Sequence, residues 1–494
     1  MASFHSRELE GTLVINRQEL LELATQFSLR PDVVEKDYAL GWLLAGIGRH
    51  PDLVESWVFK GGTCLKKCFF ETYRFSEDLD FTILKPEHLN ADFLQNTFNE
   101  IANWIYEQTG LELPAENRSF EVYETNGKPA AQGRIAYRGP IAPRRDLPKV
   151  KLDLTNDECV VRPPVRKIVI RPYSDCNDIA EVTSYCYEEI FAEKTRALSE
   201  RLRPRDLYDL IHMFRHVELR PDPATIRQIL EEKCRYKNIP FPAFDALSQD
   251  ARKTELEAEW KNMLAHQLPM LPPFNQFWDE LPEVFAWLSG VKVPAILPSI
   301  AVEEETETAP LTFTQPRAPV ILPTETKRPV WVPPVTQFFE RPLGALEIIR
   351  FAGANRLCII LGYNGKKRLV EPYSFRRSKE GNLILHTVRV DNREHCSYRV
   401  DKIESAELTQ TAFVPRYAIE LTESGPLYAP PQERSSTSTR WTRSSPRQKY
   451  IFRCSVCGKK FTRQKYDATL NEHKNKDGNK CYGRYGTYEG TKWS

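Results

Sequence analysis

Hydrophobic and polar positions follow two periods over the first 290 residues. Apolar residues recur every three or four positions in most of this stretch, which predicts amphipathic helices. The segments with that spacing are 16–27, 31–44, 63–70, 89–108, 188–201, 205–216, 223–237 and 254–268. Shorter apolar or alternating segments predict strands at 56–59, 79–84 and 149–154. We therefore expect a multidomain α/β protein whose first domain, 1–290, has an α/β part at about 30–180 and a helical part at about 181–290.

The pattern changes after residue 290. Residues 291–336 are rich in proline, threonine and glutamate and predict an extended linker. Alternating segments then predict a small all-β domain, a barrel, over 337–423. Its expected strands are 345–351, 357–363, 369–375, 382–390, 395–400 and 403–408. A second linker, rich in serine and arginine, is expected at 424–448, followed by a small module with cysteines and a histidine at 449–494.

Composition narrows the class of protein. The 494 residues include 11 cysteines, an odd number with irregular spacing, which argues against a disulfide framework and for a reducing compartment. The first residues contain no apolar signal core, and no run of about 18 apolar residues occurs. We therefore expect a cytoplasmic protein with no membrane span. The net charge is only +2, but residues 449–494 carry seven more positive than negative charges.

The densest chemistry lies between residues 59 and 84. A short strand ends at Gly61-Gly62, where the lack of side chains lets the backbone turn sharply and approach a phosphate. Thr63 begins a helix whose free N–H groups face that turn and suit a triphosphate. Asp78 and Asp80 stand two residues apart at the start of a strand, so both carboxylates point the same way.

A third carboxylate is expected from the strand at 149–154. Its alternation places Lys151 and Asp153 on one face. Asp78, Asp80 and Asp153 would together hold two Mg²⁺ ions about 4 Å apart, and Lys151 would help to bind the phosphates of an NTP. Alone, a Gly-Gly pair is a common turn and an Asp-x-Asp pair a common surface feature. Their order along the chain, with the later Lys-x-Asp strand, favours catalysis.

These motifs resemble those of the AbiEii/AbiGii toxin nucleotidyltransferases, in the DNA polymerase β superfamily. The similar segments are Glu35-Lys36-Asp37-Tyr38, Gly61-Gly62-Thr63, Arg74-Phe75-Ser76-Glu77-Asp78-Leu79-Asp80, Lys151-Leu152-Asp153-Leu154 and residues 188–210. The resemblance covers about residues 15–280 and implies a polymerase-β-like fold. It also implies that the glycine turn and Thr63 contact nucleotide phosphates, that the three aspartates bind metal, and that Lys194 and Asp209 complete the site. Without the resemblance, an ion pair between two helices is the simpler interpretation of Lys194 and Asp209.

The resemblance also carries expectations about activity. Members of this family act as toxins in toxin–antitoxin or abortive-infection systems, and some resemble tRNA nucleotidyltransferases. We therefore expect transfer of NMP from an NTP to RNA, with tRNA as acceptor, an antiphage role and an antitoxin protein as partner. The alternative is a nucleic-acid-binding regulator whose transferase fold senses nucleotide without turnover. The three carboxylates favour the enzyme, since a site without chemistry has no reason to keep them.

The predicted β domain resembles a WYL domain, a small Sm-like barrel of bacterial regulators. The residues that fit are Arg368, Glu371, Pro372, Tyr373, Arg376, Arg393, Tyr398, Arg399 and Asp401. The resemblance implies ligand sensing, often of nucleic acid, and Tyr373 and Tyr398 with the arginines could form a basic stacking surface for single strands. A rim of ion pairs is an equally good interpretation of the same residues.

The C-terminal module has the spacing of a CCHC-type zinc finger. Cys454, Cys457, His473 and Cys481 supply four ligands for one structural Zn²⁺. The module is too small to bury a core unaided, so a metal is expected to hold it together. Its positive charge, with Tyr482 and Tyr485, indicates nucleic-acid contact, and a solvated basic tail is the alternative.

Overall fold

The computed structural model describes eleven segments of the chain in two compact units. The described residues are 15–26, 29–70, 73–141, 146–176, 179–294, 297–300, 344–378, 381–422, 425–427, 448–463 and 468–493. The units are residues 1–432 and 433–494, and each is considered by itself. The two predicted linkers fall largely outside the described residues.

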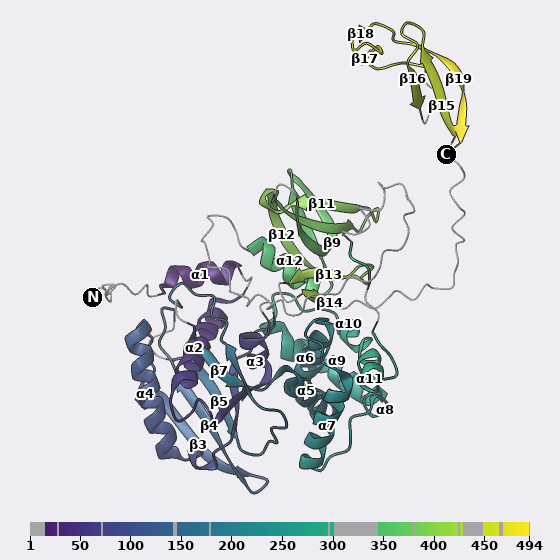
Figure 1. Ribbon diagram of the computed structural model, residues 1–494. Coiled ribbons are helices and arrows are strands. Elements are labelled where there is room, and N and C mark those ends of the chain that lie inside the picture. The colour runs from purple at the N-terminus through teal and green to yellow at the C-terminus, as the bar shows by residue number, and fades with distance from the viewer. Residues whose placement is uncertain are drawn as a thin grey trace, which may run out of the picture. The chain divides into compact units, whose positions relative to one another are not determined.

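A seven-stranded sheet organises the N-terminal part of the first unit (Figure 1). Its order is β3-β4-β5-β2-β1-β7-β6, with β2 parallel to β5 and antiparallel to β1. The strands are β1 (Trp57–Lys60), β2 (Asp78–Ile83), β3 (Arg118–Thr125), β4 (Lys128–Ala136), β5 (Lys149–Thr155), β6 (Val165–Ile168) and β7 (Glu181–Ser184). The predicted strands correspond to β1, β2 and β5, which form the middle of the sheet.

Helices cover one face of this sheet. They are α1 (Arg17–Gln26), α2 (Pro31–Arg49), α3 (Gly61–Cys68) and α4 (Ala91–Thr109), with short 3₁₀ turns η1 (Pro86–His88) and η2 (Ala115–Asn117). The two longest, α2 and α4, lie side by side on the sheet (Figure 1). Helix α4 begins where the Asn90 side chain accepts the N–H groups of Asp92 and Phe93, and it ends at Gly110, whose φ is 72°. The predicted helix at 89–108 is thus confirmed.

A bundle of helices follows the sheet in sequence. Its members are α5 (Tyr187–Arg201), α6 (Pro204–Arg215), α7 (Pro223–Lys237), α8 (Phe244–Leu247), α9 (Asp250–Leu264), η3 (Ala265–Gln267), α10 (Phe274–Trp278) and α11 (Leu281–Leu288). Asp222 accepts the N–H of Thr225 at 2.9 Å and so caps α7, with Pro223 at its first position. The helical character predicted for this half is confirmed.

The predicted β domain is not all-β. Its elements are α12 (Gly344–Ala354), β8 (Leu357–Tyr363), β9 (Lys366–Arg377), β10 (Leu383–Arg389), β11 (His395–Arg399), η4 (Val400–Lys402), β12 (Ile403–Ala412), β13 (Ile419–Thr422) and β14 (Gly425–Leu427). The strand expected at 345–351 is wrong, because its apolar residues are spaced for one face of a helix and Glu347 pairs with Arg350 one turn later, at 3.1 Å. The described pairings form an open branched sheet in which β11 and β12 do not pair, so they show no closed barrel.

This sheet and α12 share a buried boundary with the helical bundle. The Tyr208 hydroxyl donates to Asn355 at 3.0 Å, and Arg215 donates to the carbonyl of Ala354 at 2.9 Å. Glu280 accepts from Arg215 at 2.6 Å and also pairs with Arg356. All of these side chains are buried. The two parts therefore form one continuous core rather than two separable domains.

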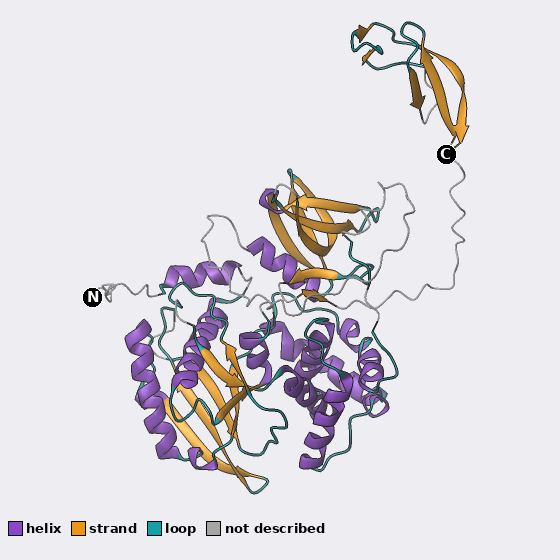
Figure 2. Ribbon diagram, viewed as in Figure 1, coloured by secondary structure: helices purple, strands orange, loops and turns teal. Residues whose placement is uncertain are grey.

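The second unit contains short strands and loops in its described part (Figure 2). Strands β15 (Gln448–Cys454), β16 (Lys460–Arg463) and β19 (Gly486–Trp493) form one sheet, and β17 (His473–Lys474) pairs with β18 (Lys480–Cys481). Across the described residues of both units, no helix combines the length and the apolar character needed to span a bilayer.

Candidate functional site

Three carboxylates lie on one face of the large sheet. Asp80 on β2 lies directly opposite Asp153 on the parallel strand β5, and Asp78 lies opposite Lys151. Neighbouring strands are about 4.8 Å apart, and residues two apart on a strand share a face, so Asp78, Asp80 and Asp153 all point to the same side. The Lys151 ammonium group contacts Asp153 at 2.7 Å.

Burial is the largest influence on the pKa of both Asp78 and Asp80. Burial, with the nearby charges of Asp153 and Asp78, raises the pKa of Asp80 to about 6 against the opposing pull of Lys60. Burial and Asp153 also raise the pKa of Asp78, although Lys36 and Lys151 act in the other direction. Like charges that repel in this way are stabilised by a bound cation. Carboxylate oxygens are the donors that Mg²⁺ prefers, so the donor set on this face fits a divalent metal ion.

Gly61 and Gly62 each lie against a charged side chain. Gly61 has a φ of +82°, and a Cβ atom there would clash with the Asp80 carboxylate. A Cβ at Gly62 would clash with the guanidinium of Arg74. The Thr63 hydroxyl is buried and donates to the carbonyl oxygen of Asp78 at 2.5 Å. The Asp80 and Arg74 side chains therefore pack against the turn and leave no room for a Cβ atom, and Thr63 fixes the start of β2 through its side chain.

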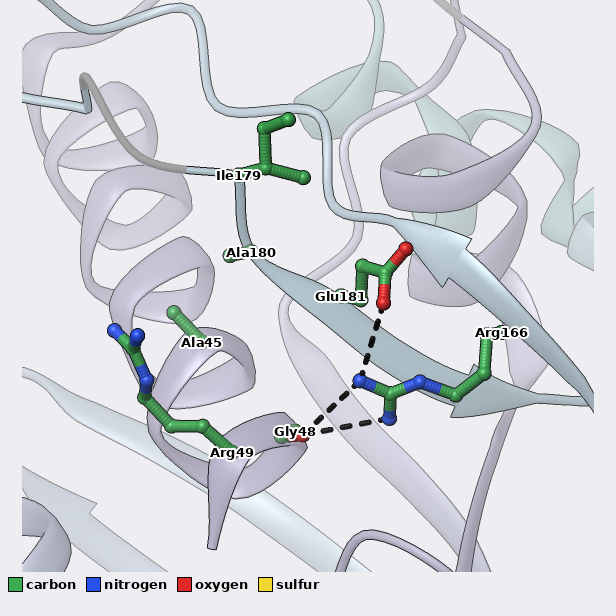
Figure 3. A pocket seen from close by; sticks show the side chains of 7 residues that line it. All are labelled: Ala45, Gly48, Arg49, Arg166, Ile179, Ala180 and Glu181. Carbon is green, nitrogen blue, oxygen red and sulfur yellow. Dashed lines mark hydrogen bonds and ion pairs between the residues drawn. The ribbon is translucent and has the colours of Figure 1, made fainter.

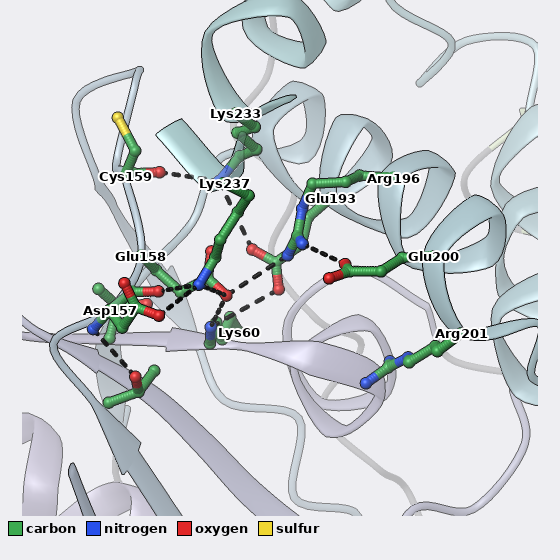
Figure 4. Close-up of polar contacts among 12 residues, drawn as sticks. Lys60, Asp157, Glu158, Cys159, Glu193, Arg196, Glu200, Arg201, Lys233 and Lys237 are labelled. Carbon is green, nitrogen blue, oxygen red and sulfur yellow. Dashed lines mark hydrogen bonds and ion pairs between the residues drawn. The ribbon is translucent and has the colours of Figure 1, made fainter. Parts of the chain in front are cut away.

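Lys60, which directly precedes the glycines, joins the sheet to the helical bundle. It lies opposite Asp80 on β1, and its ammonium group is 3.7 Å from both Glu158 and Glu193 (Figure 4). Burial alone would raise the pKa of Glu193, but the attraction of Lys60 and Lys233 lowers it to about 2. The bundle thus presents an ionised glutamate that holds Lys60 beside the carboxylate face.

Lys194 and Asp209 form a second cluster, and the Lys194 charge is near enough to lower the pKa of Asp80. Asp209 accepts from Arg74 at 2.6 and 2.7 Å and from Lys194 at 2.8 Å, and the Tyr73 hydroxyl also donates to it. Its side chain has no exposed surface. Burial alone would raise the pKa of Asp209, but Arg74 and Lys194 outweigh it and lower the pKa. Lys194 also contacts Asp206 at 3.2 Å. The pair is therefore an interhelical ion pair, and Arg74 ties it to the glycine turn.

Comparison with known proteins assigns the domain that carries these clusters. The sequence profile of the family described as "Nucleotidyl transferase AbiEii toxin, Type IV TA system" matches residues 42–286. Residues 42–286 are an AbiEii nucleotidyltransferase domain. Among solved structures, the chain is similar to MenT4, a nucleotidyltransferase toxin from Mycobacterium tuberculosis, at 19% identity and a TM-score of 0.37. That likeness covers 56% of this chain and 91% of the other. The search of curated proteins returned no match.

The AbiEii domain contains both clusters, from β1 to the helical bundle. Sequence reasoning did not single out Lys60 or Arg74 as site residues. The signal for Lys60 was its place at the end of the strand that enters the glycine turn. Arg74 stands within the Arg-Phe-Ser-Glu-Asp-Leu-Asp motif itself. In both cases the partner carboxylate lies more than 90 residues away in sequence, so no local pattern reveals the contact.

A hollow elsewhere in the AbiEii domain lies apart from these clusters. It lies between the C-terminal end of α2 and the strands β6 and β7 (Figure 3). Its lining residues are Ala45, Gly48, Arg49, Arg166, Ile179, Ala180 and Glu181. Arg166 is already engaged there, since it contacts Glu181 at 3.5 Å and the carbonyl of Gly48 at 3.3 Å. None of the lining residues belongs to the carboxylate face.

Outside the AbiEii domain, the four predicted zinc ligands lie together. The ligand atoms of Cys454, Cys457, His473 and Cys481 all lie within 4.8 Å of one another. The sulfur atoms of Cys454 and Cys481 are 3.8 Å apart, close to the spacing of two thiolates on one tetrahedral ion. His473 Nδ1 lies 2.9 Å from the carbonyl of Asn471, which leaves Nε2 facing Cys457 at 3.3 Å. The backbone N–H of Cys457 is the main influence that lowers the pKa of Cys454, to about 6.

Two tyrosines of the β domain are not available for stacking. Tyr373 and Tyr398 are buried in its core. Two of the arginines expected on the same surface are paired, Arg376 with Glu420 and Arg399 with Asp401. Of the two interpretations left open by the sequence, these contacts favour the rim of ion pairs, since the two aromatic rings pack inward and the two arginines are paired.

Proposed function

We propose that the AbiEii domain transfers NMP from an NTP to the 3′ hydroxyl of RNA, with tRNA as the acceptor, and that the protein acts as a toxin in abortive infection. The observation that carries this proposal is the register of β2 and β5, which puts Asp80 beside Asp153 with Asp78 on the same face. Two Mg²⁺ ions bound to these carboxylates would activate the attacking hydroxyl and stabilise the pyrophosphate leaving group.

The chain's own groups have separate tasks in this reaction. The N–H groups at the start of α3, after the glycine turn, suit the phosphates of the NTP. Lys60 adds positive charge on that side. Asp153 lies on β5, which is farther from the glycine turn than β2, and would face the acceptor. As the acceptor hydroxyl gives up its proton to solvent and its oxygen bonds to the α-phosphorus, the bond from that phosphorus to the pyrophosphate oxygen breaks, so the NMP passes to RNA and pyrophosphate leaves.

The remaining parts support the same proposal. Zn²⁺ bound by Cys454, Cys457, His473 and Cys481 would hold the C-terminal unit, because that unit has only a small apolar core. Tyr482 and Tyr485 are 78% and 69% exposed on it, beside basic side chains, which suits contact with RNA bases. The sheet after α12 is proposed to be WYL-like, and an antitoxin protein is proposed as the partner that restrains the enzyme.

A labelling assay tests the enzyme. The full-length protein is incubated with each α-³²P-labelled NTP, Mg²⁺ and total RNA, and the RNA is resolved on a gel. Wild type is expected to label RNA of tRNA size. Asp80→Ala should lose at least about a thousandfold in rate, because the metal site loses a central ligand. Asp222→Asn, an exposed carboxylate change that keeps a helix cap, serves as the matched control and should retain activity.

The same assay separates the enzyme from the regulator. A regulator that only senses nucleotide would bind an NTP in the presence of Mg²⁺ and label no acceptor. Labelling that is equal for wild type and Asp80→Ala would refute the role of the carboxylates. The size of the labelled species distinguishes tRNA from other RNA.

A further inference from the structure

The catalytic face of the large sheet continues past Asp153 onto the neighbouring strand. Register places Gln132 of β4 opposite Asp153, and Arg134 of β4 opposite Lys151. Residues two apart on a strand share a face, so Lys149 lies beside Lys151 on the same side of β5. We call the polar surface formed by Lys149, Lys151, Arg134 and Gln132 the β4–β5 ledge.

The ledge is open to solvent, while the reverse side of the same strands is core. Lys149 and Arg134 are exposed, and the Lys151 side chain is 42% exposed. The alternating residues Val150 and Leu152 are fully buried. The buried side is the one that α2 and α4 cover (Figure 1). The ledge is thus the part of the catalytic face that carries polar side chains and still reaches solvent.

One cation of the ledge contacts Asp153 directly, and a second is linked to it through Gln132. Arg134 donates to the Gln132 side chain at 3.2 Å, and Gln132 donates to Asp153 at 3.3 Å. Lys151 contacts the same carboxylate at 2.7 Å. Among the described residues, no carboxylate lies within ion-pairing distance of Arg134 or Lys149. Two of the three cations therefore have charge to offer to a ligand.

The strand order of the sheet indicates which substrate would meet the ledge. The glycine turn and α3 follow β1, on the opposite side of the carboxylates from β4, so the triphosphate and the ledge lie on different sides of the reacting centre. The acceptor hydroxyl must then approach from the Asp153 side. A protein side chain or a small alcohol has no phosphates for a row of cations, whereas a polynucleotide has one before every terminal nucleoside.

We propose that the β4–β5 ledge binds the 3′-terminal segment of a single-stranded RNA acceptor, with Arg134, Lys149 and Lys151 on its last phosphodiesters and its terminal hydroxyl at Asp153. This proposal rests on the proposed function and names the surface that presents the acceptor. Gln132 is a positioning residue, because it links Arg134 to Asp153 and does not itself reach the reacting atoms.

Kinetics with charge reversal provide the first test. Arg134→Glu and the double variant with Lys149→Glu are compared with Lys85→Glu, an exposed lysine beyond the other end of β2. The ledge variants should raise the KM for an RNA oligonucleotide at least about tenfold and leave the KM for NTP unchanged. They should also flatten the dependence of log kcat/KM on log salt by about one for each phosphate that is no longer bound. An unchanged acceptor KM, or an equal effect of Lys85→Glu, would overturn the proposal.

Crosslinking provides a test that does not need turnover. A single-stranded RNA that ends in 4-thiouridine with a free 3′ hydroxyl is irradiated with the full-length protein, and the linked peptides are identified by mass spectrometry. The terminal base should link to peptides of β4 and β5, and Arg134→Glu should weaken that link. Links only to the C-terminal unit would overturn the ledge. A link to β4 and β5 without NMP transfer by wild type would support the ledge and reject the proposed reaction.

Discussion

Asp209 and Asp80, two carboxylates of the AbiEii domain, differ in whether a cation contacts them. Asp209 is buried against Arg74 and Lys194, which neutralise it and lower its pKa. Asp80 has no cation within 4.0 Å among the described residues, and burial with its acidic neighbours raises its pKa to about 6. A carboxylate that is already neutralised contributes to the fold. One that is held in a buried setting without a cation in direct contact remains able to bind a metal ion.

The largest effect on stability is expected at the neutralised group. Asp209→Asn should lower the free energy of unfolding by about 3–5 kcal/mol, because the buried Arg74 loses its counter-charge and Lys194 keeps only Asp206. Urea unfolding followed by tryptophan fluorescence measures this change, and Asp222→Asn should stay within about 0.5 kcal/mol of wild type. If Asp209→Asn were as stable as wild type and inactive, Asp209 would act on substrate and the contrast between the groups would fail.

Replacing Asp80 by asparagine should change the free energy of unfolding in the opposite direction to Asp209→Asn. In metal-free buffer at about pH 7.5, Asp80→Asn should raise the free energy of unfolding by about 1–2 kcal/mol. The folded pKa lies above the ordinary value of 3.8, so this aspartate stabilises the fold when protonated and loses that contribution as the pH rises through about 6. Thermal melts at pH 7.5 and pH 5 measure the gain, which should shrink at the lower pH. A destabilised Asp80→Asn at pH 7.5 would show that burial does not penalise the ionised form of Asp80.

Mg²⁺ competes with that proton. At limiting Mg²⁺, the apparent second-order rate constant for Mg²⁺ should rise as the pH increases through about 6, because only the ionised Asp80 binds metal. At saturating Mg²⁺ the inflection should move to lower pH. A rate that does not change between pH 5 and pH 7.5 at limiting metal would show that Asp80 does not titrate in this range.

The smallest effect is expected from replacing Lys60, which lies opposite Asp80 on β1. Lys60→Met removes the strongest influence that lowers the pKa of Asp80, so the inflection should move upward by about half to one pH unit. The comparison is the full pH–rate profile of Lys60→Met against that of Lys85→Met. An inflection that stays in place would mean that Lys60 serves only to join the sheet to the bundle through Glu193.

The sequence predicted the centre of the AbiEii domain better than its margins. Helices with clear caps, such as α7 after Asp222, and strands with uniform apolar character, such as β1, were found. Strands β3, β4, β6 and β7 were missed. Strand β3 exposes most of its residues, and β6 and β7 have four residues each, so none of these three gives a strong alternating pattern. Segment 345–351 was assigned to a strand although its apolar spacing suits a helix.

The contacts of the site also divide into those that local sequence predicts and those that it does not. Local spacing sufficed to group Asp78 with Asp80, and alternation on one strand placed Asp153 with Lys151. The contacts of Lys60 and Arg74 depend on helices encoded far downstream, and the Gln132 link to Asp153 depends on a strand that was not predicted. The Cys/His cluster could be predicted because its four residues are closely spaced in sequence and so belong to one compact module.

The boundary around Glu280 has a consequence for how the protein is made. The helical bundle is synthesised before Arg356 and Asn355 exist, so a chain that stopped short of α12 would leave Tyr208 and Glu280 without these partners and would uncover apolar side chains. Early termination products should therefore be cut readily by proteases. A host cell would meet a mature transferase only after the ribosome had passed well beyond the AbiEii domain.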